Sequence, residues 1–230
     1  MMSSIAIIPA RYGSKRVPNK NFRQLGGKPL LTYTVEQALA CATLRRIVIS
    51  TDHPDIHSVL DGFDPDRVIA HQRHPDLGGD RITTEAVLLE VLDQDWAAKT
   101  DFVVTLPPTA PFRSARTIDA CIELFVSRDA DSVLAVSARK IRMGSFDSET
   151  QAFAFTLERP PVNMAHWPLT YFDNSSVYVT KSSVLRETGF ILGTRNFAVV
   201  TDHIEGHDIN DPLDWAMAEA MIEKGFVEAR

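Results

Sequence analysis

Short apolar runs alternate with longer amphipathic stretches over most of the chain. Such runs are typical of buried strands in a parallel sheet. They lie at residues 5–8, 47–50, 102–106 and 132–136. Between them, apolar residues recur three and four positions apart, the spacing of one helix face, as in Leu31, Val35, Ala38 and Leu39, and again in Val87, Leu88, Val91 and Leu92. The pattern predicts a Rossmann-like, three-layer α/β fold with a mainly parallel sheet.

The alternation breaks between residues 139 and 173. Pro160, Pro161, Pro168 and several aromatic residues replace the clean pattern there, so we interpret 139–173 as an insertion within one domain, residues 1–230. Aromatic side chains in such a segment cap the core, cover a ligand or pack against a second subunit, and composition alone does not choose among these.

The sheet pattern resumes after the insertion. Further strands are expected at residues 176–180 and 197–200. Residues 211–224 follow a helical pattern, and Pro212 near its start is well placed for a first helical turn. The chain therefore closes with a helix that follows the last strand.

Composition narrows the possible partners. The 230 residues are 44% hydrophobic and 23% charged, which suits a soluble globular protein. A formal net charge of −6 argues against general affinity for nucleic acid or for an anionic membrane. The two cysteines, Cys41 and Cys121, lack metal-ligand spacing and are expected to be buried thiols. The apolar run at 5–8 is too short for a signal peptide or membrane span, so a cytoplasmic location is expected.

Positive charge concentrates directly after the first predicted strand. Residues 9–21 contain four cations, Arg11, Lys15, Arg16 and Lys20, together with Gly13 and Ser14. Ligands of open parallel sheets bind beyond the carboxyl ends of the strands, and several cations with backbone amides suit a triphosphate there. The alternative is a solvated basic loop, which has no need of small residues beside its cations. The glycine spacing fits neither the Walker loop nor the dinucleotide motif.

The motifs in this loop resemble a known family. The stretches Ile8-Pro9-Ala10-Arg11, Gly13-Ser14-Lys15 and Lys20-Asn21 resemble the opening of the cytidylyltransferases that activate acidic sugars, the CMP-N-acylneuraminate and CMP-Kdo synthetases. The resemblance extends over nearly the whole chain. Its further landmarks are Gly27-Lys28-Pro29-Leu30, Ile49-Ser50-Thr51-Asp52, Arg73, the turn from Pro108 to Arg113, Asn174, Tyr178, and Asp208-Ile209-Asn210 before the last helix.

The resemblance implies a nucleotidyltransferase that uses CTP and Mg²⁺ and forms a homodimer through the insertion 139–173. It implies that the nucleotide is bound by Arg11, Gly13, Ser14, Lys15, Asn21, Arg73 and Thr84. The implied sugar-binding residues are Thr109, Asn174 and Tyr178. Catalysis would rest on Lys15, Arg11 and Asp208, and the metal on Asp208 and Asn210. Simpler roles remain open: Arg73 as a surface cation, and Asp208 or Asp211 as a helix cap.

Three departures from the family pattern lie on the acid side of the site. Asn210 stands where a second carboxylate is usual, Pro107 where sialic-acid enzymes carry glutamine, and Ser175 where glycine follows the asparagine. The CTP assignment is therefore better founded than any particular acid, and a nonulosonic acid is the expected acceptor. Tyr12 favours a Kdo-type enzyme as the alternative. The substitutions at 107 and 210 also motivate a non-catalytic nucleotide-binding protein.

Overall fold

Seven strands form the central sheet of this computed structural model, which describes residues 2–55, 60, 62–79, 81–157 and 162–227. From one edge to the other the order is β11, β7, β10, β6, β1, β4, β5. Their bounds are β1 Ser4–Pro9, β4 Ile47–Thr51, β5 Val68–Gln72, β6 Phe102–Thr105, β7 Ser132–Lys140, β10 Leu169–Lys181 and β11 Asn196–Thr201. Only β10 runs against its neighbours, so the predicted, mainly parallel sheet is confirmed.

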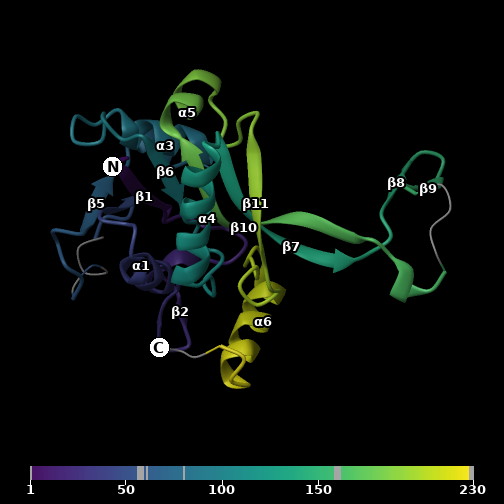
Figure 1. Cartoon of the computed structure of the whole chain (residues 1–230). Helices are drawn as coiled ribbons and strands as arrows, with labels where there is room; N and C mark the ends of the chain where they lie inside the picture. The colour runs from purple at the N-terminus through teal and green to yellow at the C-terminus, as the bar shows by residue number, and fades with distance from the viewer. Residues whose placement is uncertain (1, 56–59, 61, 80, 158–161, 228–230) are drawn as a thin grey trace.

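Helices cover both faces of the sheet (Figure 1). The helices are α1 Leu30–Ala40, α3 Thr84–Leu92, α4 Ala115–Arg128, α5 Ser182–Thr188 and α6 Pro212–Glu223. Apolar side chains of α1 and α4 pack against one face, and those of α3 and α5 against the other. This arrangement confirms the three-layer prediction. The apolar spacing that predicted α1 and α3 marks their buried sides, since Leu31 and Leu88 are both fully buried.

The last helix forms a third apolar cluster below the sheet. Trp215 and Ala218 of α6 pack with Leu25, Leu30 and Phe112. Between β1 and α1 the chain forms the 3-10 turn η1 Lys20–Phe22 and then a short hairpin of β2 Gln24–Leu25 with β3 Lys28–Pro29. This packing fixes the segment that precedes α6 against the loop that follows β1.

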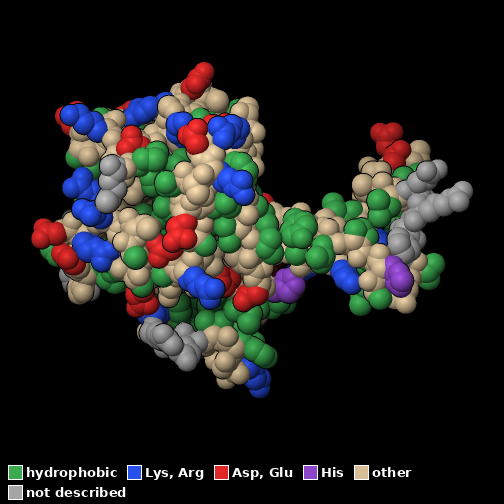
Figure 2. Space-filling model, in the orientation of Figure 1, with side chains coloured by type: hydrophobic (Ala, Val, Ile, Leu, Met, Phe, Trp, Pro, Cys, Tyr) green, Lys and Arg blue, Asp and Glu red, His purple; other side chains and the backbone are tan. Residues whose placement is uncertain are grey.

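The inserted segment is an arm built on two sheet strands (Figures 1 and 2). β7 and β10 continue to pair beyond the core, from Asp173 opposite Val136 to Leu169 opposite Lys140. The predicted strands at 132–136 and 176–180 are therefore parts of longer strands, which extend into the predicted insertion 139–173. Side chains 169–173 of β10 alternate between exposed and half-buried, and β7 becomes exposed at 139 and 140, so no apolar run reveals these parts of the strands.

The tip of the arm carries a second hairpin, β8 Gly144–Phe146 with β9 Phe153–Phe155, and the 3-10 turn η3 Met164–His166. Pro160 and Pro161 lie outside the described residues. We refer to residues 136–173 as the arm. Several large apolar side chains are exposed along it: Met143, Phe146, Phe153, Phe155, Leu157 and Met164.

The carboxyl ends of β1, β4, β5 and β6 lie together at one edge of the sheet, because these strands are parallel. The loops that follow them are thereby gathered in one place, as the sequence predicted. None of the helices in the described parts of the chain is long and apolar enough to cross a membrane.

Candidate active site

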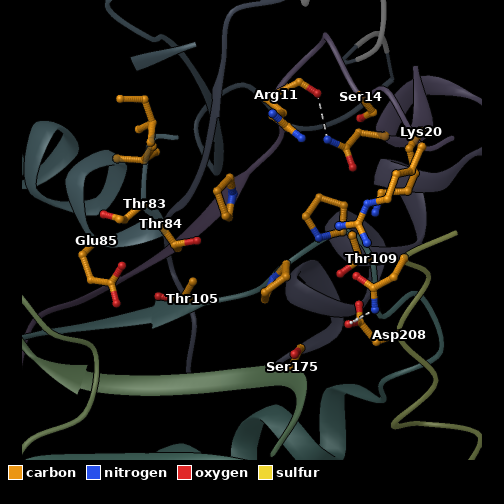
Figure 3. Close-up of a pocket in the computed structure, with 18 of the residues that line it drawn as sticks. Arg11, Ser14, Lys20, Thr83, Thr84, Glu85, Thr105, Thr109, Ser175 and Asp208 are labelled. Carbon is orange, nitrogen blue, oxygen red and sulfur yellow. Dashed lines mark hydrogen bonds between the residues drawn. The ribbon is translucent and has the colours of Figure 1, made fainter. Parts of the chain in front are cut away.

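A cleft of about 470 Å³ opens at this edge of the sheet (Figure 3). The loop after β1 forms one wall, the start of α3 and the end of β6 form another, and β10 with the segment before α6 closes the third. Ten residues predicted for the site line the cleft. They are Arg11, Ser14, Lys15, Asn21, Arg73, Thr84, Thr109, Tyr178, Asp208 and Asn210.

The loop after β1 is folded onto the protein. The Asn21 side chain donates through Nδ2 to the Arg11 carbonyl at 2.9 Å, and the Tyr12 amide donates to Asp52 Oδ1 at 2.7 Å. The loop brings Arg11, Lys15, Arg16 and Lys20 to the cleft together. A solvated basic loop is therefore not what the structure shows, because these four cations share one concave surface that suits an anionic ligand.

Gly13 is the first predicted residue that does not line the cleft. A Cβ atom built on it would meet no other atom within 4 Å. The glycine is therefore not required by close packing in this structure. Its predicted nucleotide contact would have to come from its backbone.

Asn21 and Arg73 are buried beneath the cleft wall. Asn21 is 4% exposed, and its Oδ1 has no hydrogen-bond partner among the described residues. This oxygen can therefore accept a hydrogen bond from a ligand. Arg73 is 5% exposed and donates to the Ser50 carbonyl at 3.0 Å. Burial lowers the pKa of Arg73, which the Asp52 and Glu90 carboxylates oppose. Arg73 is thus not a simple surface cation.

Asp208 faces the cationic loop from the segment before α6. The Ile209 amide donates to the Thr109 carbonyl at 2.8 Å, and Lys20 Nζ donates to the Ile209 carbonyl at 2.6 Å. Asp208 Oδ2 accepts from Asn210 Nδ2 at 2.7 Å, while its Oδ1 is buried with no partner in the described chain. A buried, unpartnered carboxylate oxygen fits a hard cation such as Mg²⁺.

The cap of α6 is Asp211, and Asp208 has no part in it. The Asp211 side chain accepts from the Leu213 and Asp214 amides, at 2.9 Å and 3.0 Å, in a capping box with Asp214. The capping role that the sequence left open for Asp211 is therefore confirmed, and that for Asp208 is wrong. Asp211 does not line the cleft, whereas Asp208 and Asn210 do.

A buried arginine supports the turn that carries Thr109. Arg113 is 1% exposed and donates to Thr34 Oγ1 at 3.1 Å and to the Pro107 carbonyl. Burial lowers its pKa to about 9, with Asp208 and Glu205 opposing the change. Arg113 is still a cation at neutral pH, so it adds positive charge behind Asp208 without touching the cleft.

Of the three residues predicted to bind the sugar, Thr109 and Tyr178 line the cleft and Asn174 does not. Asn174 is 3% exposed, donates to Ser137 Oγ and Thr201 Oγ1, and accepts from Ser176. Its amide is fully used inside the sheet, so the structure does not support a direct contact with the acid. The neighbouring Ser175, with φ of 58°, lines the cleft in its place.

The cleft also contains residues that are not among the binding and catalytic residues implied by the resemblance. Lys20 is one, and burial lowers its pKa while Asp208 opposes that change. Its place in the Lys20-Asn21 motif was the available signal. Thr105 and Glu85 are two more, and neither belongs to a motif. Only the strand register and the direction of α3 bring them to the cleft.

Comparison with known proteins shows the family to which the chain belongs. A family model described as cytidylyltransferase matches residues 5–184. The chain is 31% identical to the CMP-N,N'-diacetyllegionaminic acid synthase of Legionella pneumophila, over 96% of this chain and 97% of that protein. It is 26% identical to an N-acylneuraminate cytidylyltransferase of Escherichia coli, covering 96% of this chain and 52% of that longer protein.

A solved structure shares the fold. CMP:2-keto-3-deoxy-manno-octonic acid synthetase complexed with CTP superposes with a TM-score of 0.69 at 17% identity, over 97% of this chain and 99% of that one. At this identity the likeness concerns the fold alone. The family match over most of the chain and the nearly full-length similarity to the Legionella enzyme establish the assignment: this chain belongs to the cytidylyltransferase family.

Proposed function

We propose that this cytidylyltransferase transfers CMP from CTP to the anomeric hydroxyl of a nonulosonic acid and releases pyrophosphate. One observation carries the proposal: the cationic loop, Asp208, Thr109 and Tyr178 all line a single cleft. The loop and Asp208 suit a nucleotide with its metal, and Thr109 and Tyr178 are left for a second substrate. The full-length similarity to an enzyme named for a legionaminic acid supports the choice of acceptor.

The chain's own residues contribute binding and charge compensation. Arg11 and Lys15 would hold the triphosphate, while Asn21, Arg73 and Thr84 would bind the rest of the nucleotide. The acid's hydroxyl oxygen attacks the α-phosphorus in line. A P–O bond to that oxygen forms, the P–O bond between the α-phosphorus and the pyrophosphate oxygen breaks, the hydroxyl proton passes to solvent, and pyrophosphate leaves. Positioning and neutralisation of developing negative charge supply most of the acceleration in such transfers.

Mg²⁺ is part of the proposal. Asp208 and Asn210 would hold the ion, aided by substrate phosphates and water, because Mg²⁺ often depends on few protein ligands. The described residues contain no cluster of three or more His, Cys, Asp or Glu side chains suited to a metal. When bound, Mg²⁺ would offset phosphate charge. Asn210 keeps Asp208 oriented through the 2.7 Å hydrogen bond between their side chains.

The direct test is pyrophosphate release from CTP and Mg²⁺ with N-acetylneuraminic, legionaminic, pseudaminic and Kdo acids. We expect release with at least one of the first three. Release with Kdo alone would favour the Kdo-type alternative, which Tyr12 suggests. Tight CTP binding with no release for any acid would favour the non-catalytic alternative, which the intact loop and Asp208 argue against.

We also propose that the protein is cytoplasmic and forms a homodimer through the arm. Exposed Phe146 and Phe153 are 64% and 53% accessible, an apolar surface that a second copy would cover. We expect a solution mass near twice 25.6 kDa. Phe146→Asp with Phe153→Asp should shift the mass toward one chain, whereas Phe190→Asp, at an equally exposed site off the arm, should not. A monomeric wild-type protein at micromolar concentration would contradict the proposal.

A further inference from the structure

Glu90 is a largely buried carboxylate that the proposed reaction does not use. It belongs to α3, its side chain is 17% exposed, and it does not line the cleft. Removing a carboxylate from water is costly, so such a group is normally compensated by hydrogen bonds and by opposite charge. The groups that compensate Glu90 therefore indicate what the residue does.

The alternation of side chains along β5 directs His71 toward Glu90. Val68 and Ala70 of β5 pack on the sheet face that α1 and α4 cover. Successive side chains of a strand point to opposite faces, so His71 lies on the face that α3 covers. There, His71 Nε2 lies 3.4 Å from Glu90 Oε2, and neither atom has a hydrogen-bond partner in the described chain. The two side chains therefore form a largely buried pair between β5 and α3.

The second oxygen of Glu90 holds the chain on the other side of Arg73. Glu90 Oε1 accepts a hydrogen bond from the His74 amide at 2.7 Å. One carboxylate thus contacts residues 71 and 74, and Arg73 lies between them in the chain. Because α3 begins at Thr84, which lines the cleft, Glu90 connects the segment that carries Arg73 to a helix that forms another part of the cleft wall.

The buried guanidinium of Arg73 depends on nearby negative charge. It donates to the Ser50 carbonyl at 3.0 Å, and its hydrogen bonds to Ser50 Oγ and to the Leu77 carbonyl are both 3.4 Å long. All three acceptors are neutral. Burial lowers the pKa of Arg73, and the Asp52 and Glu90 carboxylates oppose this change. The charge of Glu90 therefore favours Arg73 as a buried cation.

We propose that Glu90 is a positioning residue for CTP binding, which holds Arg73 in place through its contacts on both sides of that residue and through its charge. Glu90 does not line the cleft, so it acts through Arg73 and not on the nucleotide directly. The inference rests on the proposed function, in which Arg73 binds the part of CTP outside the triphosphate. Loss of the Glu90 charge is therefore expected to weaken CTP binding and to leave the chemical step intact.

The test is Glu90→Gln, measured by calorimetric titration with CTP in the absence of an acid. Glutamine keeps an oxygen that can accept from the His74 amide and removes the charge. We expect the affinity for CTP to fall about fivefold to tenfold, which is within the range of coupling between neighbouring charged groups. In turnover assays the KM for CTP should rise by a similar factor, while kcat and the KM for the acid stay within about twofold.

A double-mutant cycle tests whether Glu90 acts through Arg73. Arg73→Met alone should weaken CTP binding at least as much as Glu90→Gln does. In the Arg73→Met background, Glu90→Gln should have little further effect, because the group that it positions is already absent. Unchanged CTP affinity in Glu90→Gln would overturn the proposal. Additive losses in the double variant, together with a lower melting temperature, would indicate a merely structural role for Glu90 and would overturn it as well.

The control is Glu123→Gln, which removes the same charge from an exposed position on α4 and should leave CTP affinity unchanged. Failure of the proposed function gives a different result. If the wild-type protein binds CTP but releases no pyrophosphate with any acid, only the transfer reaction fails, and the titrations still decide the role of Glu90. If the wild-type protein binds no CTP, the nucleotide assignment fails, and the role of Glu90 fails with it.

Discussion

Replacing Asp208 with asparagine should lower kcat by roughly two to three orders of magnitude, the range seen when one group that stabilises transition-state charge is lost. The change preserves the size of the side chain but removes the charge from the buried, unpartnered Oδ1. Pyrophosphate release at saturating CTP and acid measures the effect. The Mg²⁺ concentration that gives half-maximal rate should rise in the same variant, since the oxygen that fits the ion has lost its charge.

Asp211→Ala is the matched control for this variant. Asp211 lies three residues away but caps α6 and does not line the cleft. Its loss should cost about 1 kcal/mol of stability, measured by denaturant unfolding, and leave kcat nearly unchanged. If Asp208→Asn kept full activity while Asp211→Ala lost it, the roles assigned to the two carboxylates would be reversed.

The parts of the fold with strong local signals were predictable from sequence. Fully buried strands such as β1 and β4 form apolar runs, and α6 begins at an Asp-Pro pair that both caps and opens a helix. The cationic loop was recognisable because its charges stand out in an acidic protein. β5 was missed because its apolar run is only three residues long, Val68 to Ala70, and polar His71 and Gln72 follow it.

The rest of the site depends on contacts between distant segments. Asn174 looked like a sugar ligand, yet its partners Ser137 and Thr201 come from β7 and β11, which the sequence does not place beside it. Thr105 belongs to no sequence motif. Only the strand register shows that it lies opposite Tyr178 and beside the cleft. Local patterns therefore predicted most of the residues that line the cleft, but neither the position of Thr105 nor the burial of Asn174.

Replacing Lys15 with alanine should lower kcat/KM for CTP by about a hundredfold or more, since a charge-assisted contact to a phosphate oxygen is among the stronger single interactions. Lys15 is exposed and lines the cleft beside Arg11 and Ser14. Its removal should therefore leave the melting temperature unchanged. Initial rates at varied CTP, with the acid saturating, separate an effect on kcat from one on KM.

Lys15→Arg and Arg116→Ala complete this experiment. Lys15→Arg keeps the charge and should recover much of the lost rate, whereas Arg116→Ala removes an exposed cation on α4, outside the cleft, and should have no effect. A fall confined to KM would mean that Lys15 binds ground and transition states equally. Unchanged turnover of Lys15→Ala at saturating CTP would show that Arg11, Arg16 and Lys20 alone neutralise the triphosphate, and Lys15 would lose its catalytic role.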